Sequence, residues 1–374
     1  MTETIPWGMV GGGISGFIGE VHRLAARLDG GYRLEAGCFS SDGTRNRESG
    51  ALFGVAPDRV YGDFAEMARR EAERPDGIRA VSIVTPNHLH YAATRAFLEA
   101  GIDVICDKPL TTTLSEAREL EALARGQGRT LAVTYNYSAN AMIRLARQLV
   151  AEGALGELRL VQVEYAQDWL ARNIEQDGQK QASWRTDPQQ AGRAGCLGDI
   201  GVHAYNLARF VTGRSARRVS AELSAFVPGR QVDDNVQARL DFGDGIRGAL
   251  WASQVAVGSE NALRLRLIGE KASLDWEQEH PNQLRFAEYG EAPRILSRNG
   301  AGFPPSLQHL CRIPAGHPEG YLEAFANLYG EIRRGLTSAS GDFTDVSDAV
   351  ADLAFIEACL DSQDNDNRWC PLER

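Results

Sequence analysis

The sequence lacks three features that mark particular classes of protein: an excess of basic residues, a long apolar run and paired cysteines. Its 374 residues carry a formal net charge of −10. No basic run interleaved with aromatic residues occurs, which argues against a nucleic-acid-binding surface. No apolar run reaches the length of a membrane span, and the first six residues lack the basic start and apolar core of a signal peptide. We therefore expect a cytoplasmic protein without nucleic-acid or membrane partners.

The cysteines and histidines form no recognisable metal-binding or disulfide pattern. The six cysteines are scattered along the chain without a C-x-x-C pair, which favours reduced thiols over a disulfide framework or a zinc site. His88 and His90 alternate where an expected strand gives way to a loop, but no third ligand lies at metal spacing. We expect no bound metal.

What the chain does contain is a glycine-rich turn close to its start. The apolar run Trp7–Val10 leads into the spacing G-x-G-x-x-G at Gly11, Gly13 and Gly16. A helical pattern follows at once, with one apolar face formed by Ile18, Val21, Leu24, Ala25 and Leu28. In a dinucleotide site the first glycine allows the tight turn, the second lets the backbone approach a pyrophosphate, and the third lets the helix pack on the strand. The alternative is an ordinary glycine-rich turn, but its place between a strand and a helix favours dinucleotide binding.

Length and sequence pattern together predict two domains. A chain of 374 residues is too long for one ordinary hydrophobic core. Up to residue 138, strand and helix patterns alternate, which predicts a doubly wound parallel sheet with helices on both faces. The expected strands after the first are Tyr32–Phe39, Arg79–Val84, Asp103–Cys106 and Thr130–Tyr135. We expect a Rossmann domain over residues 1–138.

From residue 139 onward the strands are longer and alternate between apolar and polar residues. Val236, Ala238, Leu240 and Phe242 alternate with polar neighbours, and Gly243-Asp244-Gly245 predicts a hairpin turn. One apolar and one polar face predict an open, mostly antiparallel sheet that helices cover on one side only. Two helical stretches, 319–334 and 346–361, could supply that cover. Residues 139–374 are therefore expected to form an α+β domain.

Two loops at the expected carboxyl ends of the parallel strands carry candidate functional residues, because ligands of such sheets bind there. They are Thr85-Pro86-Asn87-His88 and Asp107-Lys108-Pro109. Proline restricts the residue before it to extended geometry, so Lys108 has a defined direction. From spacing alone, a role in a ligand site and a simple ion pair at the sheet edge are equally good interpretations of Lys108.

A second group of candidate residues lies on one expected helix. Asp199 and His203 are four residues apart in a glycine-flanked stretch, so they share one helix face. A carboxylate beside an imidazole can fix its tautomer and tune its proton affinity, as a general acid/base requires. The alternative is an N-capping aspartate and a buried histidine.

The three motifs, in this order, resemble the Gfo/Idh/MocA family of dehydrogenases: the glycine loop, Asp107-Lys108-Pro109 and the Asp199/His203 pair. The usual E-K-P of the family is D-K-P here, which keeps the lysine and the negative charge. The run Gly11–Arg27 is similar to the branch with inositol- and levoglucosan-type dehydrogenases. The resemblance implies catalytic roles for Lys108, Asp199 and His203, and a C-terminal domain for substrate binding and oligomerisation, as a homodimer or homotetramer.

We expect the cofactor to contact the glycine loop and the strand ends, at Gly11, Gly13, Ile14, Ser15, Gly16, Ser40, Ser41, Asp42, Arg45, Thr85, Pro86, Asn87, His90, Asp107 and Lys108. We expect the substrate to contact Tyr135, Asn136, Tyr137, Gln167, Trp184, Arg185, Asp199 and His203. Asp42 favours NAD, because a carboxylate near the ribose repels the extra phosphate of NADP. Ser40, Ser41 and Arg45 keep NADP possible.

The resulting hypothesis is a nicotinamide-dependent dehydrogenase that oxidises a secondary hydroxyl of a cyclic polyol or sugar, such as an inositol, an anhydrosugar or a glycoside. Two alternatives stay open. One is an NAD-dependent glycosidase that uses a transient oxidation. The other is a non-catalytic sensor of sugar or NAD, although a sensor has no need of Lys108, Asp199 and His203 together.

Overall fold

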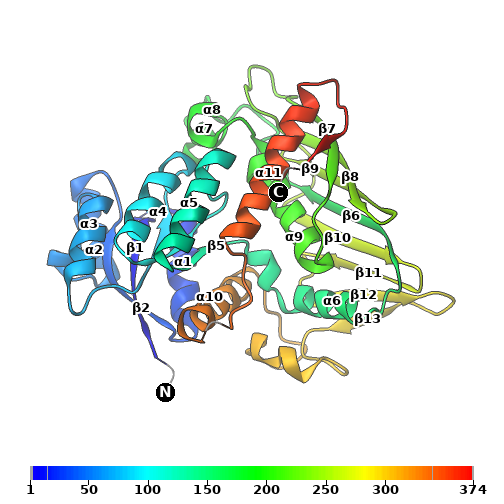
Figure 1. Ribbon diagram of the computed structural model, residues 1–374, viewed down its shortest axis with the longest axis horizontal. Coiled ribbons are helices and arrows are strands. Elements are labelled where there is room, and N and C mark those ends of the chain that lie inside the picture. Colours follow the sequence, from blue (N-terminus) through cyan, green and yellow to red (C-terminus); the bar gives the residue numbers. More distant parts are fainter. Residues whose placement is uncertain (1–2, 15, 339, 373–374) are drawn as a thin grey trace. The chain divides into compact units, whose positions relative to one another are not determined.

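The computed structural model describes residues 3–14, 16–338 and 340–372, and these residues form two compact units (Figure 1). The first unit consists of the chain up to Asn136 together with Phe325–Val350. The second consists of Tyr137–Ala324 and the chain from Ala351 onward. The sequence pattern placed everything after residue 138 in a second domain, so the return of Phe325–Val350 to the first unit is a feature that the pattern did not predict.

Within the described residues, the first unit contains a five-stranded parallel sheet in the order β2-β1-β3-β4-β5. Its strands are β1 (Ile5–Gly11), β2 (Tyr32–Cys38), β3 (Ala80–Val84), β4 (Asp103–Cys106) and β5 (Leu131–Val133). The helices between them are α1 (Phe17–Leu28), α2 (Gly43–Phe53), α3 (Phe64–Glu73), α4 (His90–Glu99) and α5 (Leu114–Gln127). The predicted Rossmann architecture is confirmed.

The strands of this sheet are apolar because both faces of the sheet are covered. Trp7, Met9 and Ile83 are 0% exposed. The predicted buried face of α1 is partly wrong: Leu24 and Leu28 are 48% and 45% exposed. The helix instead buries a face that contains small residues and a histidine, namely Gly19, Val21, His22, Ala25 and Ala26. Small residues bring the helix axis closer to the sheet than leucines would.

A buried chain of hydrogen bonds ties the returning segment to the first unit. Helix α10 (Tyr321–Ser338) carries Tyr329, whose hydroxyl lies 2.7 Å from both His22 Nδ1 and Ser82 Oγ. Trp7 Nε1 donates to Ser82 Oγ at 2.9 Å. An indole N–H can only donate, so Ser82 accepts from Trp7, while either hydroxyl can donate between Ser82 and Tyr329. Unpaired polar groups are costly in a core, and Tyr329 of α10 supplies a partner to both Ser82 and His22 Nδ1.

The second unit contains, among the described residues, a nine-stranded mixed sheet in the order β13-β12-β11-β10-β6-β9-β8-β7-β14. Only β6 and β9 pair in parallel there, so the predicted open, mostly antiparallel sheet is confirmed. Its strands are β6 (Leu158–Ala166), β7 (Arg218–Ser224), β8 (Asn235–Gly243), β9 (Ile246–Ser253), β10 (Ala262–Gly269), β11 (Ala272–Glu277), β12 (Gln283–Glu288), β13 (Arg294–Ser297) and β14 (Cys370–Pro371). Gly243–Gly245 forms the predicted hairpin between β8 and β9.

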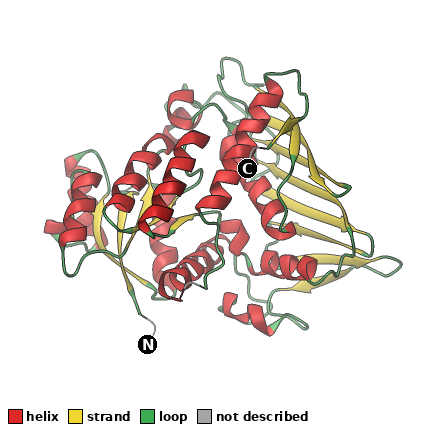
Figure 2. Cartoon of the chain, viewed as in Figure 1, coloured by secondary structure: helices red, strands yellow, loops and turns green. Residues whose placement is uncertain are grey.

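Helices lie on one face of this sheet (Figure 2). They include α6 (Ala141–Ala151), α9 (Val202–Thr212) and α11 (Val346–Gln363). Tyr205 of α9 stacks on Phe355 of α11, with ring centroids 3.9 Å apart. The stretch 319–334 does not supply the predicted cover, because α10 from Phe325 onward belongs to the first unit and α6 and α9 pack on the strands instead. No helix in the described ranges is both long enough and apolar enough to cross a bilayer.

The buried histidine of the first unit predicts a loss of stability in acid. Burial lowers the pKa of His22 from 6.5 to about 4, against the opposing effect of Asp107. The unfolded chain therefore binds a proton below pH 6.5 while the folded chain does not. The contribution of neutral His22 to the free energy of unfolding is complete above pH 6.5. It falls by about 2 kcal/mol between pH 7 and pH 5.

We expect the difference in unfolding free energy between wild type and His22→Asn to shrink by about 2 kcal/mol over that range, because asparagine keeps an acceptor but does not titrate. Chemical denaturation at pH 7 and pH 5 measures this difference. His280→Asn, at an exposed histidine, is the matched control. An equal difference at both pH values would contradict the assignment.

Candidate functional site

The glycine loop of the first unit has the backbone geometry that a dinucleotide site needs. Gly11 ends β1 with φ +82°, and a Cβ there would lie 2.8 Å from the carbonyl oxygen of Val84. Gly13 donates to the carbonyl of Phe39 at 3.2 Å, and the amide of Ile14 donates to Ser49 Oγ at 3.1 Å. These bonds fix the loop at the carboxyl end of the sheet.

Close packing of α1 is provided by Gly19, not by Gly16 as predicted. A Cβ at Gly19 would lie 2.3 Å from Gly12 Cα, whereas one at Gly16 would lie 3.2 Å from the nearest atom. Gly16 is the N-cap of α1, and no described side chain caps this helix. A helix N-terminus without a side-chain cap suits a phosphate group. Ser15, also predicted to contact the cofactor, lies outside the described residues.

The loop after β2 holds the residues predicted to distinguish NAD from NADP. Asp42 is the N-cap of α2, and its carboxylate accepts the backbone N–H of Arg45 at 2.8 Å. This bond lowers the pKa of Asp42, so the side chain is held as an anion. Ser40 Oγ accepts the amide of Asp42, and Ser41 and Arg45 are exposed beside it.

The loop after β3 contains a polar atom that fits a ligand. Thr85 Oγ1 is buried and has no hydrogen-bond partner among the described residues, and Pro86 and Asn87 follow it, half-buried. A buried hydroxyl without a partner is costly, so a ligand group at this point would satisfy it. Together with the glycine loop, this atom shows that the residues present fit a dinucleotide.

His90 braces this loop and does not face a ligand as predicted. Its side chain is 1% exposed, and its Nδ1 and Nε2 lie 2.8 Å and 2.9 Å from the carbonyl oxygens of Pro109 and Thr85. Burial lowers the pKa of His90, and the neutral imidazole donates to one of these two carbonyls. His90 connects the loop after β3 to the segment that follows Lys108.

Asp107 holds the backbone on which Lys108 is placed. Its Oδ1 accepts the amide of Lys108 at 2.9 Å and the hydroxyl of Thr134 at 2.7 Å. Asp107 therefore fixes the main chain of Lys108 and joins it to the residue that follows β5. Lys108 itself is half-buried.

Three residues predicted to bind substrate follow β5, namely Tyr135, Asn136 and Tyr137. All three are buried, with exposed fractions of 2%, 2% and 6%. The side-chain nitrogen of Asn136 has no partner in the part of the chain that the structure describes. An unsatisfied buried amide again fits a ligand.

In the second unit, a widened turn carries Asp199 at the start of α9. Residues Leu197–Gly201 form a π-helical turn, a geometry often found at functional sites. The side chain of Asp233 holds this turn in place. Its two carboxylate oxygens accept the backbone amides of Gly195 at 2.6 Å and Leu197 at 2.7 Å. Burial raises the pKa of Asp233 to about 6, against the effect of these bonds.

Gln254 and Arg185, which come from different elements, are side-chain partners of Asp199. Its Oδ2 accepts Nε2 of Gln254 at 2.8 Å, and Nε of Arg185 lies 3.3 Å from the same oxygen. Arg185 ends the short helix α7 (Lys180–Arg185), and its guanidinium lies over the ring of Trp184, 4.1 Å from the centroid. The predicted substrate residues Arg185 and Trp184 thus lie beside Asp199.

His203 is 9% exposed and lies against two tyrosines. The rings of Tyr137 and Tyr165 meet its ring edge-on, at centroid distances of 5.1 Å and 6.2 Å. The two hydroxyls lie 2.6 Å apart, and Tyr165 donates to Asn261 Oδ1 at 2.8 Å. Gln167 donates to the same oxygen at 2.7 Å. Burial raises the pKa of both tyrosines, so they stay protonated.

Several residues of this site were not found from the sequence: Tyr165, Asp233, Gln254 and Asn261. Most of these residues lie where a strand begins or ends. Such a position is a weak sequence signal for a site residue, because many other residues also lie at strand ends. No cluster of three or more His, Cys, Asp or Glu residues that could hold a metal ion occurs in the described ranges.

Comparisons with known proteins agree with this geometry. Residues 5–135 match the family described as "Oxidoreductase family, NAD-binding Rossmann fold", and residues 143–275 match "GFO/IDH/MocA C-terminal domain". The chain is 32% identical to the uncharacterized oxidoreductase YfiI of Bacillus subtilis, with 99% of this chain and 97% of that protein covered. It is 29% identical to the levoglucosan dehydrogenase of Pseudarthrobacter phenanthrenivorans, with 95% and 97% covered.

Among solved structures, the chain is similar to an inositol dehydrogenase homolog from Azotobacter vinelandii in complex with NADH and myo-inositol. The TM-score is 0.94 at 37% identity, with 99% of this chain and 98% of that chain covered. The similarity therefore extends over both units.

The cap on α2 generates a prediction about the cofactor. Asp42→Asn removes the negative charge but keeps an N-cap, because asparagine caps helices as well as aspartate. We expect the affinity for NADPH relative to NADH to rise about tenfold, or ~1.4 kcal/mol. Titration of reduced-nicotinamide fluorescence measures both dissociation constants without a substrate.

Glu48→Gln, which removes an exposed charge from the same helix, is the matched control. A wild-type preference for NADPH would show that Asp42 points away and that Ser40, Ser41 and Arg45 hold the phosphate.

Proposed function

Since the chain belongs to the Gfo/Idh/MocA family of oxidoreductases, we propose that it oxidises a secondary hydroxyl of a cyclic polyol or sugar to a ketone. The family predicted from the motifs is confirmed, and so is NAD as the cofactor. The relatives that act on levoglucosan and the homolog that holds myo-inositol support a ring with several hydroxyls.

The observation that carries the proposal is the polar wall around Asp199 and His203. Gln254 and Arg185 hold the carboxylate of Asp199 there, and the hydroxyls of Tyr137 and Tyr165 pair with each other. Such a wall pairs well with hydroxyl groups and penalises a substrate that lacks them, because buried polar groups would then lose their partners. A ring with several hydroxyls matches this requirement.

We assign the proton chemistry to three residues of this chain. His203 takes the proton of the reacting hydroxyl. Asp199, which lies four residues earlier in the chain, orients the imidazole of His203. Lys108 donates a hydrogen bond to the same oxygen and stabilises its developing negative charge. The glycine loop would hold NAD, which would supply the hydride acceptor for the carbon that carries this oxygen.

A substrate panel tests the proposed function directly. The panel contains inositols, anhydrosugars, aldoses and glycosides, and reduced-nicotinamide absorbance is followed with NAD. We expect turnover with at least one inositol or anhydrosugar. Release of free sugar without net reduction of NAD would indicate a glycosidase, and binding without turnover would indicate a sensor.

Substitution of the proposed acid/base residues gives a second test. We expect Lys108→Ala and His203→Ala each to lower kcat about a hundredfold or more, because each removes a proton-handling group. Both variants should stay folded and still bind NADH. Lys180→Ala, at an exposed lysine outside the proposed machinery, is the control. Near-normal kcat in either folded variant would remove that residue from the mechanism.

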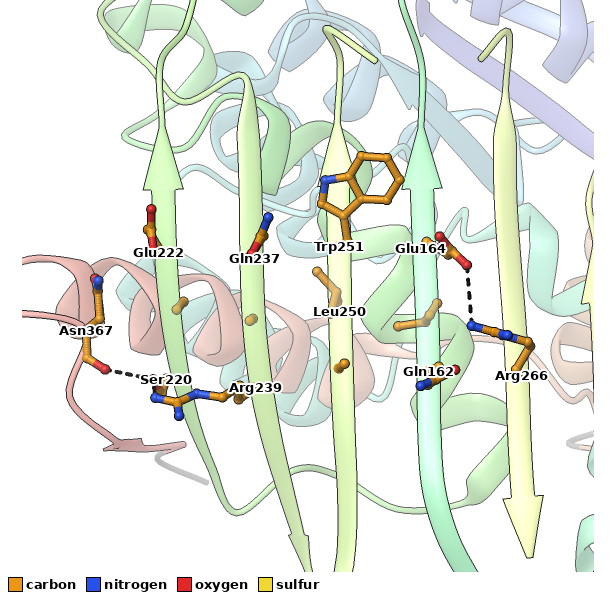
Figure 3. Close-up of a pocket in the computed structure, with 14 residues that line it drawn as sticks. Gln162, Glu164, Ser220, Glu222, Gln237, Arg239, Leu250, Trp251, Arg266 and Asn367 are labelled. Atoms are coloured by element: carbon orange, nitrogen blue, oxygen red, sulfur yellow. Dashed lines mark hydrogen bonds and ion pairs between the residues drawn. The ribbon is translucent and has the colours of Figure 1, made fainter. Parts of the chain in front are cut away.

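We also propose that the uncovered face of the nine-stranded sheet joins two copies of this chain. Figure 3 shows acidic, basic and amide side chains across neighbouring strands there, including Glu164, Glu222, Arg239 and Arg266. Arg266 lies 3.9 Å from Glu164. A face with both charge signs can pair with a copy of itself across a twofold axis. Exposed Phe226 and Val257, at 65% and 83% exposure, line a separate hollow that shares Trp251 with this face.

This interface predicts a homodimer or homotetramer at micromolar concentration, measurable by analytical ultracentrifugation. Ala249 is exposed in the middle of the face, so Ala249→Arg should shift the protein toward monomer by adding charge and bulk there. Ala51→Arg, on the exposed side of α2, should leave the assembly intact. A wild-type monomer throughout a dilution series would refute the interface.

A further inference from the structure

Gln254 is a buried amide that follows β9 directly, and its backbone is fixed on both sides. It is 2% exposed. Its N–H donates to the carbonyl of Asp234 at 2.9 Å, and its own carbonyl accepts the N–H of Leu170 at 3.1 Å. The main chain of Gln254 therefore has little freedom to move.

The two residues that hold Gln254 are themselves tied together by a buried arginine. Nη1 of Arg230 donates to the carbonyl of Leu170 at 3.0 Å and to Oδ2 of Asp234 at 3.1 Å. The Arg230 and Asp234 side chains are both 0% exposed. Breaking this closed frame would leave a buried charge without its partner, which is strongly unfavourable. Gln254 thus projects from one of the most constrained backbone segments of the second unit.

From this frame the Gln254 side chain donates to Oδ2 of Asp199 at 2.8 Å. A buried amide costs free energy unless it is hydrogen-bonded, and a bond to a charged acceptor is stronger than one between neutral groups. The other partner of the same oxygen, Arg185, is 26% exposed and ends a helix of six residues. Arg185 is therefore the adjustable partner of Asp199, and Gln254 is the fixed one.

We propose that Gln254 is a positioning residue that sets the orientation of the Asp199 carboxylate for catalysis. This inference rests on the proposed function. Gln254 acts through Asp199 and needs no contact with substrate or cofactor. Because the carboxylate is oriented before substrate binds, little side-chain freedom remains to be lost in the transition state. Arg185 remains able to turn toward substrate hydroxyls while Asp199 keeps its place.

Gln254→Leu tests this role, since leucine has nearly the same size and cannot donate. We expect kcat to fall about tenfold or more, while KM for NAD stays within about twofold. Gln127→Leu, the same change at an exposed glutamine of α5, is the matched control and should leave kcat unchanged. Unaltered kcat in Gln254→Leu would overturn the proposal.

A double-mutant cycle separates positioning from general loosening of the fold. If Gln254 acts through Asp199, Gln254→Leu should lower kcat no further in an Asp199→Asn background. A loss of the same size in both backgrounds would show that Gln254 acts independently of Asp199, and would overturn the proposal. Gln254→Glu, which keeps the shape but faces Asp199 with a second carboxylate, should lose at least as much kcat as Gln254→Leu.

A crystal structure of Gln254→Leu gives a readout that does not depend on turnover. A changed side-chain rotamer of Asp199 supports the positioning role, and an unchanged one overturns it. If the substrate panel gives no turnover at all, the proposed function fails while this structural test still decides the role of Gln254.

Discussion

The carboxylate of Asp233 accepts two backbone N–H groups, and the geometry of the second unit's site depends on this interaction. Gly195 and Leu197 supply these amides, and they lie where the chain enters the π-helical turn of Asp199. The first amides of a helix have no partners within it. In a buried position they need an acceptor, and Asp233 provides one at the end of a strand. The turn is therefore held by the sheet and not by its own helix.

Hydrogen bonds among residues at strand ends also order the polar groups around this turn. Gln254, Asn261, Tyr165 and Gln167 are placed on strand ends, and each is hydrogen-bonded to a neighbour in the described structure. Because the sheet fixes the backbones, the side chains keep their geometry without a ligand. A preorganised polar wall of this kind suits a substrate rich in hydroxyls, since little reorganisation is needed when it binds.

In the first unit, too, polar side chains hold the backbone around a candidate site residue. Asp107 uses its carboxylate to hold the Lys108 amide, and His90 uses both ring nitrogens to join two loops. The polar residues nearest to the candidate lysine thus serve its placement. By contrast, Thr85 Oγ1 and Asn136 Nδ2 are buried without partners among the described residues, which distinguishes groups that fit a ligand from groups that brace the fold.

The sequence by itself determined the features that depend on neighbouring residues. The Gly11 turn, the hairpin at 243–245 and the alternation of β8 follow from local geometry and from which face is buried, and the structure has them all. Tertiary structure alone decided which distant residues meet. Nothing near Asp199 in the sequence indicates Gln254, and nothing near His22 indicates Tyr329, because hydrogen bonds between strand ends or helices depend on how the chain folds back. For the same reason, α1 buries Gly19 and His22 where periodicity favoured Leu24 and Leu28: close approach to Gly12 and pairing with Tyr329 outweighed the apolar pattern.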